Sequence, residues 1–164
     1  MRLHFAKLFL PLAVLAGLVL SVASAGAQSS VPTGKALEGT WQVVVTQRDC
    51  TTGDPLGQPF QSLLTFASGG TMTETTDNPL FYPAVRSPGH GVWSFRSGNR
   101  YTAATTAFIT LNGTLTKTQK ITQTIVMGDD PNAFTTVKAT VQLFDPTGKL
   151  LVTGCASATG FRFR

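Results

Sequence analysis

Residues 90–127, HGVWSFRSGNRYTAATTAFITLNGTLTKTQKITQTIVM, decide the fold class of this chain. Two turn signals, Ser97-Gly98-Asn99 and Leu111-Asn112-Gly113, divide the stretch into three runs rich in Thr, Val, Phe and Ile. Gly and Asn supply the positive φ that tight hairpin turns require. The runs suit a pleated surface, and no helical i, i+3, i+4 repeat is present. The stretch therefore predicts three consecutive antiparallel strands.

The same pattern continues in both directions along the chain. Turn signals separate eight runs, which predict strands over residues 37–48, 58–67, 71–77, 90–96, 100–110, 114–127, 133–144 and 149–163. Parallel crossovers need a dozen or more connecting residues, so strands joined by short turns must be antiparallel. Closing the meander removes both exposed edges of the sheet. We predict an all-β, single-domain, eight-stranded antiparallel up-and-down (meander) barrel over residues 37–164.

The amino-terminal segment has the pattern of an export signal. A positive start, an apolar run over residues 8–20 and small-residue sites ending at Ala25 and Ala27 predict a cleavable signal peptide over residues 1–27. Residues 28–36 are expected to be a flexible segment. The apolar run is shorter than the ~20 residues of a membrane span, and nothing later is apolar enough. We therefore expect a secreted or periplasmic protein without an integral membrane segment after cleavage.

Charge and motif content narrow the possible functions. The chain has 13 Lys and Arg against 8 Asp and Glu, and the basic residues are spread singly, so no nucleic-acid partner is expected. No nucleophile elbow or phosphate loop is present. His90 is the only histidine after the signal, and zinc takes three or four protein ligands. No catalytic residue, metal or cofactor is predicted.

The two cysteines bear on barrel closure. In the first strand, Trp41, Val43 and Val45 share one face, so Cys50 falls on the opposite face if the register continues. Cys155 likewise lies opposite the small, apolar face of the last strand. The first and last strands are neighbours only in a closed barrel. A disulfide between Cys50 and Cys155 is therefore predicted for an exported protein, with two free thiols as the alternative.

The motif Gly39-Thr40-Trp41 resembles that of the calycin superfamily, which includes the lipocalins. Its members carry Gly-x-Trp on the first strand of an eight-stranded barrel, with the Trp packed across one end of the interior. The avidins are similar in this motif and in their Thr-rich strands, and the arrangement also resembles allene-oxide-cyclase-like bacterial barrels. The late arginine that packs on the Trp has no recognisable motif here, and Arg162 is the candidate substitute. The resemblance implies the fold and not the ligand.

Aromatic residues on the predicted interior faces alternate with small residues, which leaves room for a ligand in the barrel. An interior filled by these aromatics is the alternative. Two further aromatics lie in the long loop 78–89, either as a lid or as an exposed contact patch. The threonines at alternate positions of residues 114–124 are expected to face solvent. The candidate ligand-binding residues are Trp41, Phe66, Trp93, Tyr101, Phe81, Tyr82 and His90.

Three functions remain open from the sequence. The first is a non-enzymatic carrier of a small apolar molecule, with the loop 78–89 at its entrance. The second is a filled barrel that acts as a surface interaction module. The third is a barrel cyclase or isomerase in which His90 or Glu74 supplies a proton step. Around the same loop lie Glu74, Asp77, Arg86, His90 and Arg100, which are either a polar site or scattered surface charges.

Overall fold

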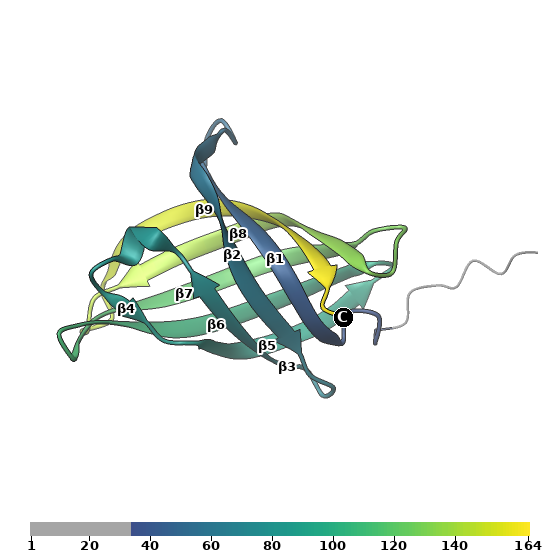
Figure 1. Ribbon diagram of the computed structural model, residues 1–164, viewed down its shortest axis with the longest axis horizontal. Coiled ribbons are helices and arrows are strands. Elements are labelled where there is room, and N and C mark those ends of the chain that lie inside the picture. The colour runs from purple at the N-terminus through teal and green to yellow at the C-terminus, as the bar shows by residue number, and fades with distance from the viewer. Residues whose placement is uncertain (1–33) are drawn as a thin grey trace, which may run out of the picture.

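The structure, a computed structural model, describes residues 34–164 as a closed antiparallel barrel (Figure 1). The predicted signal peptide and residues 28–33 lie outside the described residues. The hydrogen-bonded order is β4-β6-β5-β3-β2-β1-β9-β8-β7, and an additional pairing of β6 with β7 closes the barrel. The elements are β1 (Gly39–Arg48), β2 (Pro55–Phe66), β3 (Thr71–Asp77), η1 (Pro79–Phe81), β4 (Val85–Arg86), β5 (Gly89–Ser97), β6 (Arg100–Leu111), β7 (Thr114–Met127), β8 (Ala133–Phe144) and β9 (Leu150–Arg162).

Eight long strands form the barrel wall, which confirms the predicted class and closure. The first and last strands pair from Trp41 opposite Arg162 to Arg48 opposite Cys155. Two details differ from the prediction. β2 begins three residues before the predicted start because Pro55 still pairs with Arg48. A ninth, two-residue strand, β4, pairs with the far end of β6 beyond the part that β5 covers.

One half of the interior is filled by an aromatic core, which we call the plug. Strand alternation directs Trp41, Phe66, Tyr101 and Phe134 inward, and each is at most 2% exposed. Trp41 lies edge-on to Phe134 with ring centroids 5.0 Å apart, and Phe66 lies edge-on to Trp93 at 6.0 Å. Burial raises the pKa of the Tyr101 hydroxyl. This half of the barrel is packed in the way the filled-interior alternative predicted.

The Gly-x-Trp motif is joined to the last strand at this end. The Arg162 guanidinium lies 4.3 Å from the Trp41 ring centroid, and it donates to the carbonyls of Glu38 at 2.7 Å and Ala36 at 2.8 Å. Gly39 has φ +120°, and a Cβ there would lie 2.7 Å from Arg162 Nη1. A side chain at residue 39 is therefore excluded twice, by the backbone conformation and by the arginine. Arg162 thus packs on the Trp41 ring and ties the end of β9 to the segment before β1.

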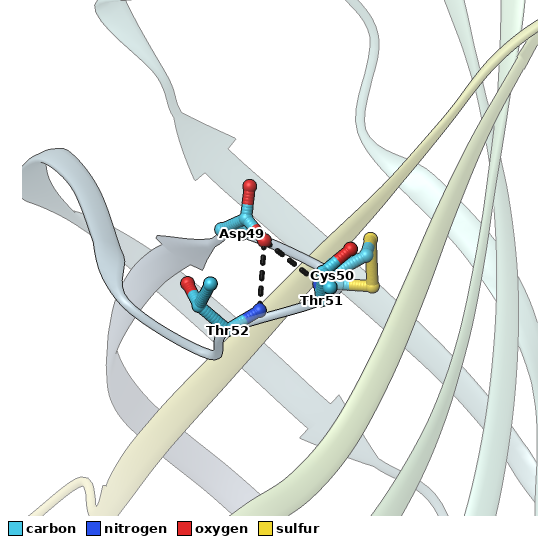
Figure 2. Close-up of a disulfide and its surroundings, with 5 residues drawn as sticks. Asp49, Cys50, Thr51 and Thr52 are labelled. Carbon is cyan, nitrogen blue, oxygen red and sulfur yellow. Dashed lines mark hydrogen bonds between the residues drawn. A yellow bond between two sulfur atoms is a disulfide. The ribbon is translucent and has the colours of Figure 1, made fainter.

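A disulfide between Cys50 and Cys155 joins the β1–β2 turn to β9, as predicted, with the Cα atoms 5.2 Å apart (Figure 2). The preceding Asp49 shapes the turn, because its Oδ1 accepts from the backbone N–H groups of Thr52 at 2.9 Å and Thr51 at 2.8 Å. These two hydrogen bonds hold the pKa of the Asp49 carboxyl below 3.8. The turn is thereby held by one covalent bond and one Asx motif.

The hairpin between β8 and β9 has a similar device. Asp145 Oδ1 accepts from the Thr147 hydroxyl at 2.7 Å and from the backbone N–H of Lys149 at 3.0 Å. These hydrogen bonds lower the pKa of Asp145 below 3.8. Both acidic turns lie at the barrel end opposite the plug, the Asp145 turn at the start of β9 and the Asp49 turn next to the Arg48–Cys155 pair.

Candidate functional site

The loop between β3 and β5 covers the barrel end opposite the plug, and we call residues 78–88 the lid (Figure 1). Its start is set by Asn78, whose Oδ1 accepts from the backbone N–H of Leu80 at 3.0 Å at the beginning of η1. Its end is held on β6: β4 pairs there, and Ser87 exchanges hydrogen bonds with the backbone of Phe108 at 2.8 and 3.0 Å. The lid is therefore attached at both ends and runs across the mouth.

Beneath the lid the barrel holds a cavity of about 80 Å³. Its apolar wall comes from five strands and from Phe81 of the lid; the residues are Val43, Val45, Phe60, Leu64, Ile121, Ala139, Val141, Ala156, Ala158 and Phe81. Polar side chains share the lining: Gln47, Ser62, Glu74, Thr76, Asn78, Gln119, Gln123, Thr136 and Ser157. The interior is thus neither wholly filled nor wholly open, because the plug fills one half and the cavity lies in the other.

A buried ion pair ties the lid to the polar side of this cavity. The guanidinium of Arg86, with a side chain 3% exposed, donates from Nη2 to Oε1 of Glu74, which is 7% exposed. Arg86 Nε donates to Gln119 Oε1 at 2.6 Å, and Thr76 Oγ1 donates to Glu74 Oε2 at 3.0 Å. Ser62 Oγ extends the network to Thr76 at 2.8 Å. Buried charges need hydrogen-bond partners in addition to each other. Arg86 has Gln119 as this further partner, and Glu74 has Thr76.

The backbone makes room for the ion pair at one position. Gly89 pairs with Glu74 across β3 and β5, and a Cβ on it would lie 2.5 Å from Glu74 Oε1. On β6, Ala107 lies opposite Gln119 in the register, so β6 adds only a methyl group at this level of the interior. The Glu74 carboxylate and the Gln119 amide therefore meet Arg86 in space that larger residues would occupy.

The five charged residues considered around this loop do not form one site. The structure brings Glu74 and Arg86 together inside the barrel. His90 pairs with Thr73 on β3, next to the Glu74–Gly89 pair, and strand alternation places its exposed side chain on the outer face. Asp77 and Arg100 are also exposed. Glu74, inside the barrel, and His90, outside it, therefore lie on opposite faces of the sheet.

The seven predicted ligand-binding residues fall into three groups. Trp41, Phe66, Trp93 and Tyr101 belong to the plug and not to the wall of the lidded cavity. Phe81 lines that cavity. Tyr82 is 88% exposed on the outside of the lid, and His90 is exposed on β5. Of the seven, only Phe81 is positioned beside the cavity.

Three polar residues inside the barrel, Gln119, Gln123 and Ser62, were not identified from the sequence. Gln119 is 6% exposed, and Gln123, four residues further along β7, also lines the cavity. Both share the parity of the buried Ile125, so the alternation that placed the β7 threonines outside also places these glutamines inside. Ser62 lies on β2 between Phe60 and Leu64, which also line the cavity, and alternation could have identified it in the same way.

A larger, open depression of about 700 Å³ lies on the outer face of β5 to β8. Its floor consists of outward-facing small residues, including Thr102, Ala104 and Thr122, with Arg96 and Lys138 among the lining side chains. Within residues 34–164, no group of three His, Cys, Asp or Glu side chains is placed to hold a metal ion. In the same residues, no helix has the length and apolar character to cross a membrane. The lidded cavity is therefore the place where polar groups converge on enclosed space.

Comparisons with known proteins give no family for this chain. No protein-family model matches it, and no curated protein matches it in sequence. Among solved structures, it is similar to the crystal structure of Rv2717c from M. tuberculosis, at 14% identity with a TM-score of 0.39. That match covers 79% of this chain and 94% of the other. A likeness of this degree carries no information about function.

Proposed function

We propose that this protein is an exported, non-enzymatic barrel that binds a small, mainly apolar molecule in the cavity beneath the lid. The observation that carries the proposal is the division of the interior. A barrel that needed only stability would gain by filling both halves, since each cavity costs dispersion contacts. Here one half is packed and the other keeps a lined cavity, with a lid held by a buried ion pair.

The cavity volume limits the ligand. At about 80 Å³ it is smaller than the ~150 Å³ cavity known to admit benzene, so it suits a molecule of a few non-hydrogen atoms. A larger ligand requires Phe81 to move, because that side chain forms the lid side of the lining. Export is supported by the signal-like amino terminus and by the disulfide, which persists in oxidising compartments. The calycin-like features, Gly39, Trp41 and Arg162 at the plug, bear on the fold, and the carrier role rests on the cavity.

Native, non-reducing mass spectrometry of protein recovered from its exported compartment tests the proposal. A mass excess that disappears on denaturation supports the carrier function and identifies the molecule. The matched variants are Ala156→Leu, which fills the cavity, and Ala104→Leu, which adds the same atoms on the outer face of β6. Loss of the excess in Ala156→Leu alone places the ligand beneath the lid. Bare protein in every sample, with no added apolar probe retained, contradicts the proposal.

A second function is favoured by the outside of the lid, where Leu80 is 72% exposed, Tyr82 88% and Val85 67%. Exposed apolar groups gathered on one loop are typical of a contact surface. In this case the barrel is a support, and the lid binds a protein partner or a second copy. Sedimentation of the wild type against Tyr82→Ser and Val85→Ser tests the second copy: association that weakens in both variants supports it.

A further inference from the structure

The cavity contains an amide whose orientation is dictated by chemistry. Arg86 can only donate hydrogen bonds, so the Gln119 side-chain atom that meets Arg86 Nε at 2.6 Å must be the oxygen. The Gln119 NH₂ group is then directed elsewhere, and among residues 34–164 no hydrogen-bond partner is recorded for it. No fully buried side-chain nitrogen or oxygen of the described residues lacks a partner. The NH₂ group of this 94% buried, cavity-lining residue therefore borders the cavity space.

Two other amides in the lining follow the same rule. Gln123 Oε1 accepts from the Thr136 hydroxyl at 3.2 Å, and Asn78 Oδ1 accepts from the backbone N–H of Leu80 at 3.0 Å. In each amide, the protein itself occupies the oxygen. The NH₂ groups of Gln119, Gln123 and Asn78 have no recorded partner in the described part of the chain. Three of the four amides in the lining therefore offer NH₂ donors to a ligand that accepts, and the fourth, Gln47, carries both an NH₂ group and an oxygen.

The charges around the cavity set the charge of that ligand. Glu74 and Arg86 are the ionised side chains of the buried network, and they compensate each other. A carboxylate ligand would lie unpaired beside Glu74, and an ammonium ligand beside Arg86, at the high cost of an uncompensated buried charge. A neutral acceptor avoids both costs and keeps the apolar wall of Val43, Ile121 and Ala156 in contact with the rest of the molecule.

We infer that the cavity recognises a small neutral carbonyl compound, such as a ketone, ester or amide, whose oxygen accepts a hydrogen bond from the Gln119 NH₂ group. This inference rests on the proposed carrier function and names its ligand class. Arg86 is the positioning residue, because its guanidinium holds the Gln119 oxygen and so turns the NH₂ group towards the cavity. Since Arg86 belongs to the lid, closing the lid and presenting the donor are one event.

Three probes of similar size separate the contributions of the carbonyl oxygen, the apolar surface and the charge to the binding affinity. Butan-2-one is the neutral carbonyl probe, 2-methylbut-1-ene replaces its oxygen by a methylene of nearly the same shape, and butanoate carries a charge. Affinities are measured by NMR titration of the full chain. [2-¹³C]Butan-2-one also reports directly on the hydrogen bond through its carbonyl chemical shift. We expect the ketone to bind about tenfold more tightly than the alkene, as one buried hydrogen bond allows, and butanoate to bind more weakly than the ketone.

Gln119→Glu is the decisive variant, because a carboxylate still accepts from Arg86 but has no NH₂ group to donate. Gln42→Glu, on the exposed outer face of β1, controls for the added charge. The inference predicts that Gln119→Glu removes the preference for ketone over alkene and the carbonyl shift, while Gln42→Glu keeps both. Equal binding of ketone and alkene, or tighter binding of butanoate, overturns the inference but leaves the carrier function standing. No binding of any probe overturns both, because the cavity then holds water only.

Discussion

The buried pair of Glu74 and Arg86 should be strongly coupled in the free energy of unfolding. Both side chains are more than nine-tenths buried, so neither charge is screened by solvent when its partner is removed. We expect Glu74→Leu and Arg86→Met each to cost about 3–5 kcal/mol, since each leaves one buried charge uncompensated. The double variant leaves no charge, only the lost hydrogen bonds to Gln119 and Thr76, and should cost about 1–3 kcal/mol.

Urea unfolding followed by tryptophan fluorescence measures these values, because Trp41 and Trp93 lie in the plug and report global unfolding. Lys138→Met on the exposed outer face is the control, and it should change stability by no more than about 0.5 kcal/mol. The reasoning is refuted if the double variant costs as much as the two single variants together, or if either single variant costs less than about 1 kcal/mol.

Three further predictions concern the ends of the strands. Replacing both Cys50 and Cys155 by Ser should lower stability by roughly 4–5 kcal/mol in urea, as expected for a bridge spanning 105 residues, and a loss below ~1 kcal/mol would contradict this. Arg162→Met should cost about 2–4 kcal/mol and alter the fluorescence of Trp41, because it removes the cation–π contact and two hydrogen bonds to carbonyls; unchanged urea midpoints would argue against it. The pKa of Asp145 is depressed by its hydrogen bonds, so its stabilising effect is complete above pH 3.8 and is lost as pH falls through the lower folded value. Carboxyl ¹³C NMR should therefore place its midpoint below 3.8, and a midpoint at or above that value would show that the turn hydrogen bonds are absent in solution.

The barrel wall could be predicted because its information is local. The tight turns with a positive φ carry Gly or Asn there, as at Gly98 and Asn112, and each strand alternates between its two faces. The disulfide followed from the same alternation, once Cys50 and Cys155 were placed on the outside of two strands that meet on closure. The strands, the closure and the disulfide can all be predicted from the two-residue alternation of side chains along a strand and from the short connections between strands.

The site could not be predicted to the same extent, because its contacts depend on an irregular segment. Arg86 reaches Glu74 through a loop whose path has no sequence period, so the two residues were seen as neighbours of one loop and not as a pair. The aromatic residues were assigned correctly to the interior as a group. The sequence does not show at what height along the barrel axis each aromatic side chain lies. Trp41 and Trp93 lie in the plug, away from the lidded cavity. Strand alternation also predicts that Gln119 faces the interior, but the candidate ligand-binding residues were chosen mainly among the aromatic side chains.

The pairing of Trp41 with Arg162 determines at which end of the barrel a linker or a surface can be attached. Both ends of the described chain emerge beside the plug, and the lid lies at the far end of the barrel (Figure 1). A fusion partner, a surface linker or a label joined at either terminus therefore points away from the mouth. Immobilising the protein through Arg164 should leave the route into the cavity unobstructed, with every molecule presenting the same end to the solution.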